Sequence, residues 1–366
     1  MQKKIITRAV IAAAFSAPAF ADSTVYGVLD AAVVSASADG QKSQLLTVSG
    51  GLSASRLGVK ASEELDGGLK AIAVLEYGLA DTQTKDGLTT ATARQQLLGL
   101  AGSFGTVATG YLQTTGYDWG SKFDVTAGSS ISPLQNITYA GSAGAGNGNT
   151  NFLIGSKAVA SRAQRALAYI SPDFGGFSFA VNYSTAMSGL GNLTVASSAT
   201  DTNVTAALAS ANYDNGPLSV GLVYAGTSNP ASTSNVTEYA LGASYDFGIA
   251  TLKGTFQSSK NGQTGTLGSA DSAYSLGAVI PAGPGAVALS YAASNIASLS
   301  NSNASGYTVG YLQGLSKTTT AYVAYSGMSQ GTATRAYSVD NSALSAATLT
   351  AGGNSSMIAL GLNKKF

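Results

Sequence analysis

The sequence predicts an all-β protein, a transmembrane antiparallel β-barrel of 16 strands. Three observations predict this fold: a short apolar leader at the N-terminus, segments of alternating apolar and polar residues along the chain, and a strand that runs to the last residue, Phe366. Beyond the leader no window of about 18 apolar residues occurs, so we expect no membrane-spanning helix.

The N-terminal leader has the features of a secretory signal peptide. Three basic residues precede the apolar run 9–15, and Ala19-Phe20-Ala21 matches a small-x-small cleavage pattern. The sequence therefore predicts two parts, a signal peptide over 1–21 and an outer-membrane barrel domain over 22–366. Export of this kind implies the envelope of a bacterium with two membranes.

The last strand carries the strongest membrane signal. Ile358, Leu360, Leu362 and Phe366 share one face, whereas Ala359, Gly361 and Asn363 share the other. Chain ends usually fray in water, but a closed barrel must pair its last strand with its first. A terminal aromatic residue also suits the membrane interface.

The remaining alternating segments are separated by connections that are short and long in turn. Sixteen strands are expected, which keeps both termini on the periplasmic side. The expected strands span residues 25–33, 51–63, 69–80, 93–102, 105–113, 162–171, 177–184, 205–213, 218–226, 237–246, 249–257, 271–280, 286–293, 305–314, 318–326 and 355–366. Residues 114–161 form an unusually long connection between the fifth and sixth strands.

Composition excludes several classes of function. The chain has no Cys, no His and only 10% charged residues, so thiol nucleophiles, Ser-His-Asp triads and His-based zinc sites are absent. We therefore predict no catalytic residues, no metal site and no cofactor, although carboxylate pairs and Lys leave an enzyme formally open. The near balance of 19 basic and 18 acidic residues gives no basic stripe for nucleic acid.

Strand alternation assigns charged residues to the interior. Arg56, Lys60 and Lys70 fall on the faces opposite the apolar residues, as do Asp30 and Glu76. An Arg on the lipid face would cost roughly 2–4 kcal/mol near the bilayer midplane, which favours lumenal placement.

Arg94 is ambiguous by the same alternation. It shares its strand face with Leu98 and Leu100, which are expected to point outward. Either orientation therefore stays open for this residue.

Several motifs occur in an order that resembles a known family. They include Thr24–Asp30, Ser49–Leu65, Gly67–Ala71, Arg94-Gln95, Phe104–Val107, Tyr169–Ser178, Leu315–Thr318 and the terminal Phe366. Together they resemble the general porins of Gram-negative β-proteobacteria, the trimeric sixteen-stranded kind. No single motif is diagnostic, but their ordered combination covers the whole mature chain.

The resemblance implies passive diffusion of small hydrophilic solutes and ions through a water-filled channel. It also implies that the long loop 114–161 folds into the lumen and sets Asp118 and Asp124 against the basic wall residues Arg56, Lys60, Lys70 and Arg94. The implied partners are further copies in a homotrimer, outer-membrane lipid and lipopolysaccharide, and the barrel-assembly machinery, which would read Phe366 in the last strand.

Two departures from the family pattern leave the ion preference open. Gly110-Tyr111-Leu112 and Ala168 stand where the family often has Arg. Two alternatives to a general porin also remain: a solute-specific channel of the same fold, and a surface adhesin or enzyme barrel. The small polar loops and the lack of His give the second alternative no support.

Overall fold

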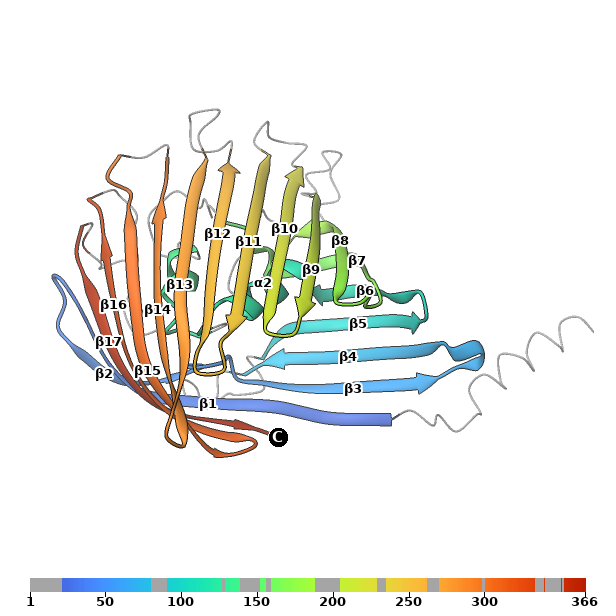
Figure 1. Cartoon of the computed structure of the whole chain (residues 1–366), viewed down its shortest axis with the longest axis horizontal. Coiled ribbons are helices and arrows are strands. Elements are labelled where there is room, and N and C mark those ends of the chain that lie inside the picture. The colour runs from blue at the N-terminus through green and yellow to red at the C-terminus, as the bar shows by residue number, and fades with distance from the viewer. Residues whose placement is uncertain are drawn as a thin grey trace, which may run out of the picture.

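The computed structural model describes residues 22–79, 91–126, 129–138, 152–155, 159–187, 205–228, 235–261, 270–297, 300–332, 339, 350 and 352–366. The predicted signal peptide lies outside these residues, so its cleavage stays a prediction. The strands of the wall form one antiparallel sheet that curves around a central space (Figure 1).

The first half of the wall begins at the mature N-terminus. Its strands are β1 (Asp22–Ala38), β2 (Gln44–Ser49), β3 (Arg56–Glu64), β4 (Lys70–Gly78), β5 (Thr92–Gly102), β6 (Gly105–Gln113), β7 (Arg162–Ile170) and β8 (Phe177–Met187). The second half continues with β9 (Thr205–Asn215), β10 (Leu218–Ser228), β11 (Val236–Asp246), β12 (Thr251–Asn261), β13 (Asp271–Ala282), β14 (Gly285–Asn295), β15 (Ala304–Ser316), β16 (Thr319–Gln330) and β17 (Ser355–Lys365).

Two α-helices and two 3₁₀ turns complete the described structure. The helices are α2 (Thr115–Phe123) and α3 (Pro133–Thr138), and the turns are η1 (Asp66–Gly68) and η4 (Val159–Ser161). None of the described helices is long and apolar enough to cross a membrane.

The ring closes between its first and last strands. Residues 28–38 of β1 pair with residues 355–365 of β17, and Phe366 exchanges backbone hydrogen bonds of 2.9 and 3.1 Å with Gly27. Closure leaves no open edge, which lipid could not satisfy by hydrogen bonding. The expected pairing of the C-terminal strand is confirmed.

The predicted number of wall strands is correct, but the second strand differs from the prediction. The other edge of β1 pairs with β2 over residues 31–36 and with β3 over residues 22–28, so the 17 strand segments fill 16 positions. The expected strand 51–63 is wrong at its start, and β2 was missed. Gly50, at φ +84°, turns the chain inward between β2 and β3.

Side chains alternate between the two surfaces of the wall as expected. Leu222, Leu276 and Leu360 are 55%, 64% and 63% exposed on the outer surface. Their strand neighbours on the inner surface are mainly small or polar, such as Ala225, Thr255 and Ser275, each at most 8% exposed. An apolar outer band around a polar interior is the pattern of a membrane barrel.

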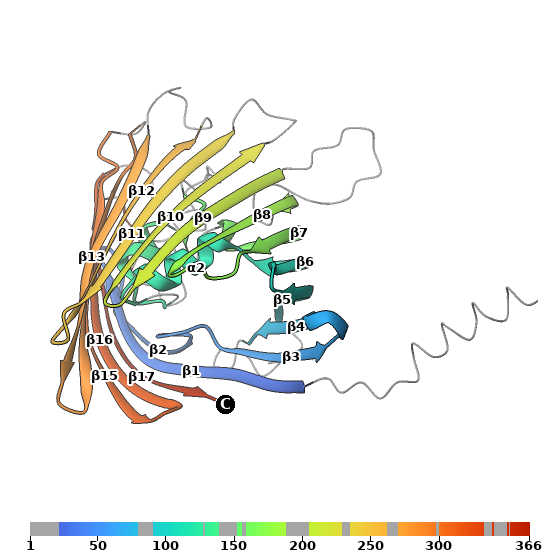
Figure 2. The same ribbon diagram turned by 45° about the vertical axis from the view of Figure 1, so that its right-hand side comes forward.

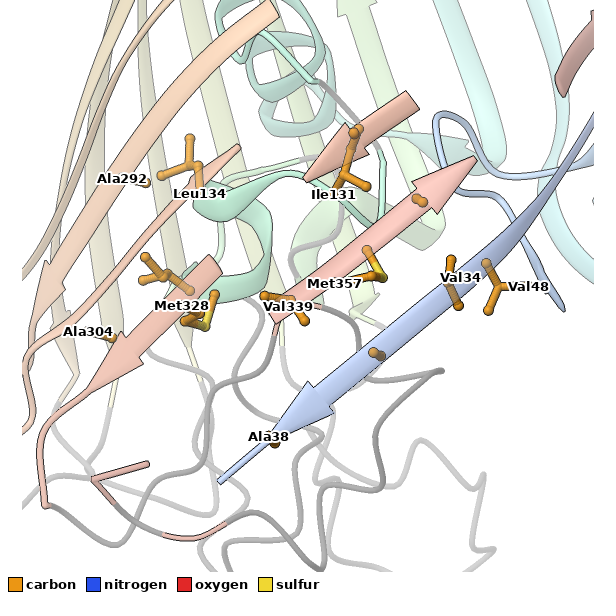
Figure 3. Packing of buried hydrophobic residues seen from close by; sticks show 14 of the residues in the cluster. Val34, Ala38, Val48, Ile131, Leu134, Ala292, Ala304, Met328, Val339 and Met357 are labelled. Carbon is orange, nitrogen blue, oxygen red and sulfur yellow. The ribbon is translucent and has the colours of Figure 1, made fainter. Parts of the chain in front are cut away.

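The buried apolar clusters lie inside the barrel, between the wall and the segment that follows β6. One cluster packs Ile131, which precedes α3, and Leu134 of α3 against Ala292, Ala304 and Met328 of the wall (Figure 3). The other packs Trp119 and Phe123 of α2 against the inner surface of β7 to β11. Figure 2 shows α2 within the curve of the sheet. The described part of 114–161 therefore lies inside the lumen, as predicted.

Asp30 of β1 stabilises the β1–β17 seam from the inner surface. The carboxylate, 0% exposed, accepts hydrogen bonds of 2.7 Å from both Tyr322 Oη on β16 and Asn363 Nδ2 on β17. It also accepts backbone hydrogen bonds of 3.2 and 3.0 Å from Leu52 and Ser53. The lumen-facing placement agrees with the alternation, and the contacts make Asp30 a residue that joins both ends of the chain.

Replacing Asp30 should weaken barrel closure. In Asp30→Ala the hydroxyl, amide and backbone donors lose a buried acceptor, and one orphaned group costs about 1–3 kcal/mol. We expect the folded band on unheated detergent gels to convert to the unfolded band at a lower temperature. Asp66→Ala, in the exposed turn η1, is the matched control. Equal conversion temperatures for both variants would contradict this role of Asp30.

Candidate functional site: charged groups facing the inward loop

Glu76 is the centre of a charged cluster on the inner surface of β4. Its side chain lies 2.8 Å from Arg94 Nε and 3.7 Å from Arg56 Nε. Tyr26 Oη donates a third contact of 3.0 Å to the same carboxylate. Because one carboxylate serves two guanidinium groups, the cluster retains a net positive charge.

A β-bulge turns Arg94 toward the lumen. Across β4 and β5, Glu76 pairs with Gln95 whereas Tyr77 pairs with Ala93, so Arg94 is the extra residue. A bulge of this kind redirects a side chain relative to simple alternation. The ambiguity that the sequence left for Arg94 is thereby settled in favour of the inner surface.

Arg162 is a third guanidinium in this region, and it was not among the predicted residues. It begins β7 directly after the inward loop, is 8% exposed, and its Cζ lies 4.6 Å from the centroid of the Tyr117 ring. Its position at the end of the loop was the available sequence signal. The prediction instead considered only Ala168, later in the same strand.

Tyr117 on α2 lies where the positive charges converge. Burial opposes ionisation of its hydroxyl, but the fields of Arg94, Arg162 and Arg56 outweigh burial and lower the pKa of Tyr117. The three arginines therefore act on one point of the inward loop although they come from three strands.

Asp118 is the acidic residue of the loop nearest to these arginines. It is exposed within the lumen and accepts a hydrogen bond from Gln113 Nε2. Although the side chain is exposed, the surrounding barrel wall and loop partly desolvate it. This desolvation raises the pKa of the Asp118 carboxyl, against the opposing effects of Gln113 and the Arg162 charge.

Asp124 has a different environment from Asp118. It is 1% exposed and accepts hydrogen bonds from Thr126 N at 3.1 Å and from Ser132 Oγ. Ser132 Oγ in turn accepts the Gln135 backbone N–H at 3.1 Å at the start of α3. Burial raises the pKa of the Asp124 carboxyl. These contacts enclose Asp124 within the loop, where it organises the turn into α3.

Lys60 and Lys70 lie apart from the Glu76 cluster. Lys60 is exposed on the inner surface of β3, between Arg56 and the turn η1 that follows the strand. Lys70 forms an ion pair of 2.6 Å with Glu64, where β3 and β4 meet beside η1. The structure thus groups Arg56, Arg94 and Glu76, and it leaves Lys70 at the end of the barrel.

The far part of the inward loop is fastened by a buried carboxylate on the opposite wall. Glu238 on β11, 0% exposed, accepts the backbone N–H groups of Leu153 and Ile154, the latter at 3.3 Å. Gln257 on β12 donates to Glu238 at 2.9 Å and to Ile154 O at 2.8 Å. Alternation puts both side chains inside, but only the folded loop shows what they bind.

Comparison with known proteins assigns the chain to a family. The family model for Gram-negative porins matches residues 9–333. The chain is a Gram-negative porin. Outer membrane porin protein 32 of Delftia acidovorans is 31% identical over 338 residues, 88% of each protein.

Solved porin structures share the fold. An anion-selective porin from Comamonas acidovorans matches with a TM-score of 0.73 at 25% identity, over 94% of this chain and 100% of that one. OmpT of Vibrio cholerae in its trimer form matches with a TM-score of 0.61 at 15% identity, over 94% and 99%.

Membership establishes the general activity and location of this porin. It resides in the outer membrane and forms a channel for passive diffusion of solutes, as the sequence predicted. Members of the family are channels and not enzymes. Within the described residues no group of three His, Cys, Asp or Glu side chains could hold a metal ion.

The raised pKa of Asp118 predicts a pH-dependent ion preference. As pH falls from 7 toward the ordinary Asp value of about 3.9, Asp118 should lose its negative charge earlier than a fully solvated carboxylate. Loss of this negative charge should shift the ion preference of the pore toward anions. Reversal potentials in a salt gradient at several pH values measure this effect.

Asp118→Asn isolates the contribution of this one carboxyl. At pH 7 the variant should already favour anions more than the parent does, and it should lack the first part of the acid-induced change. Identical pH profiles for the parent and Asp118→Asn would show that other lumenal carboxylates control the response.

Proposed function

We propose that this porin passes small hydrophilic solutes with a preference for anions. The observation that carries the proposal is the grouping of Arg56, Arg94 and Arg162 opposite α2, with Glu76 paired to two of them. Rings of basic side chains select anions in aqueous pores because they raise the local anion concentration.

The loop carries less opposing charge than its sequence implies. Asp124 is enclosed within the loop, which leaves Asp118 as the acidic residue of the described loop that is exposed beside the basic cluster. Lys60 adds a further positive charge on the inner surface of β3. The similar Comamonas acidovorans structure is described as anion-selective, which supports the same sign here.

Arg162 also compensates for the two arginines that the family often has and this chain lacks. The sequence left the preference open because Gly110-Tyr111-Leu112 and Ala168 lack the expected arginines. Arg162 brings a guanidinium to the same cluster from the start of β7. The constriction that we propose therefore consists of Arg56, Arg94, Arg162, Glu76 and the loop residues around Tyr117.

Single-channel recording tests the ion preference. In a KCl gradient across a planar bilayer, the parent should show a reversal potential of the sign that indicates chloride preference. A charge about 4 Å from an ion contributes about 1 kcal/mol even in water, and about 1.4 kcal/mol is tenfold. Arg94→Ala should therefore lower the chloride-to-potassium permeability ratio severalfold.

Lys70→Ala is the matched control, because it removes a positive charge that is paired with Glu64 away from the cluster. It should leave the ratio almost unchanged. A reversal potential of the opposite sign in the parent would reject anion preference, and equal effects of both substitutions would reject the proposed constriction.

We further propose that the porin works as a homotrimer. An apolar groove on the outer surface, lined by Ala31, Val33, Thr47, Leu360 and Leu362, lies where β1, β2 and β17 meet. Leu45 beside it is 76% exposed. Small residues flanked by protruding Leu side chains allow close packing of a second copy within the membrane.

Gel migration tests the trimer and its position. Unheated samples should migrate as a trimer and heated samples as a monomer. Leu45→Asn should weaken the trimer band, whereas Leu222→Asn on β10, exposed on the wall elsewhere, should retain it. A monomer band alone without heating would contradict the trimer, and equal loss in both variants would contradict its position.

The last strand also supports the proposed partners of assembly. Phe366 is 53% exposed at the end of β17. Its ring is available on the outer surface while its backbone closes the seam with Gly27. We retain the proposal that the barrel-assembly machinery reads this strand, and that the finished outer surface contacts lipid and lipopolysaccharide.

A further inference from the structure

Two donors of Arg162 have no hydrogen-bond partner in the described part of the chain, although the guanidinium also hydrogen-bonds to the Tyr117 hydroxyl. Its Nε and Nη2 atoms are buried and have no hydrogen-bond partner among the described residues. Burying charged donors without acceptors is costly, so this arrangement calls for an explanation. The neighbouring carboxylate Glu76 binds Arg94 and faces Arg56 instead.

The Tyr117 ring covers this guanidinium. The separation of 4.6 Å between Arg162 Cζ and the ring centroid is a cation–π contact, which partly offsets the missing acceptors. The contact places an aromatic side chain of the inward loop against an arginine of the cluster that has two buried donors without a partner among the described residues.

The two free donors have the geometry of an oxyanion receptor. Nε and Nη2 lie along one edge of the planar guanidinium, and two parallel N–H groups match two oxygens of a carboxylate or phosphate. A spherical halide cannot bridge both donors in this way. The free edge of Arg162 would therefore distinguish oxyanions from chloride if the ring were removed.

The backbone that carries Tyr117 is held independently of its ring. Thr114 O accepts the Tyr117 backbone N–H at 3.0 Å, and Asn182 Oδ1 accepts the Thr115 N–H at 2.7 Å. Trp119 Nε1 donates to Gly221 O at 3.2 Å on the wall. The side chain of Tyr117 can therefore be shortened while α2 stays in place.

We propose that Tyr117 is a specificity-determining residue that covers a bidentate oxyanion site on Arg162. With the ring in place, small anions pass the positive cluster without being retained. With the ring absent, a carboxylate or phosphate binds the Nε/Nη2 edge of Arg162 and obstructs the pore. The inference rests on the proposed anion preference, which brings such solutes to the cluster.

Block of the chloride current by phosphate tests whether the Tyr117 ring covers the oxyanion site on Arg162. Single-channel conductance of Tyr117→Ala in KCl at pH 7 should fall in a saturable manner when inorganic phosphate is added, with half-block at a concentration at least about tenfold lower than in the parent. Tyr117→Phe keeps the ring over Arg162 but loses the hydroxyl that hydrogen-bonds to the guanidinium, so we expect its half-block concentration to stay close to that of the parent if the ring is the cover.

A double variant identifies the phosphate-binding group. Tyr117→Ala combined with Arg162→Lys keeps the positive charge but lacks the planar pair of donors, so the added block should disappear. Tyr117→Leu, which lacks the aromatic face but fills part of the volume, should show the block at intermediate strength and replaces Tyr117→Ala if that variant does not form stable trimers.

Two results would contradict the proposal that Tyr117 covers an oxyanion site on Arg162. One is a Tyr117→Ala channel that conducts more but has the same phosphate sensitivity as the parent, because the ring would then act only by its size. The other is an unchanged block in the double variant. The sign of the parent reversal potential separately tests the anion preference, so failure of that proposal is distinguishable from failure of this one.

Discussion

Closure of the β1–β17 seam is the constraint on which the rest of the structure depends. A backbone that crosses lipid must satisfy its hydrogen bonds within the protein, and only a closed ring leaves no strand edge unpaired. The chain meets this requirement with backbone bonds up to Phe366 and with Asp30, which joins β1, β16, β17 and the segment after β2. The lumen forms only after that closure, and the charged side chains take up their positions around it at the same time.

A closed wall of this size encloses a space that its own side chains do not fill, and the inward loop occupies part of it. Polar groups that enter with the loop need partners, because unpaired buried groups are costly. Glu238 accepts backbone groups at Leu153 and Ile154, whereas Asp124 accepts those of the loop itself. Trp119 and Phe123 add apolar contact with the wall. Acidic residues thus fix the loop in place, while the arginines dominate the electrostatic field beside it.

Local periodicity accounts for much of the candidate site. Arg56, Glu76 and Asp30 were placed on the inner surface because strand alternation has a period of two, and the structure confirms their orientation. Arg94 required a bulge, which arises from the register between β4 and β5 and not from the residues of β5 alone. Asp124 was expected to face the basic wall, yet the fold of its own loop buries it.

The sequence by itself determined the barrel class and the number of wall strands, because both depend on repeated local patterns along the chain. Its ordered motifs indicated the family, and that resemblance implied the inward loop. Tertiary structure alone decided that β2 and β3 share one wall position, that Arg162 joins Arg56 and Arg94, and that Tyr117 covers Arg162. These features bring together residues that are distant in sequence. Their contacts depend on strand register and loop docking, which only the closed barrel fixes.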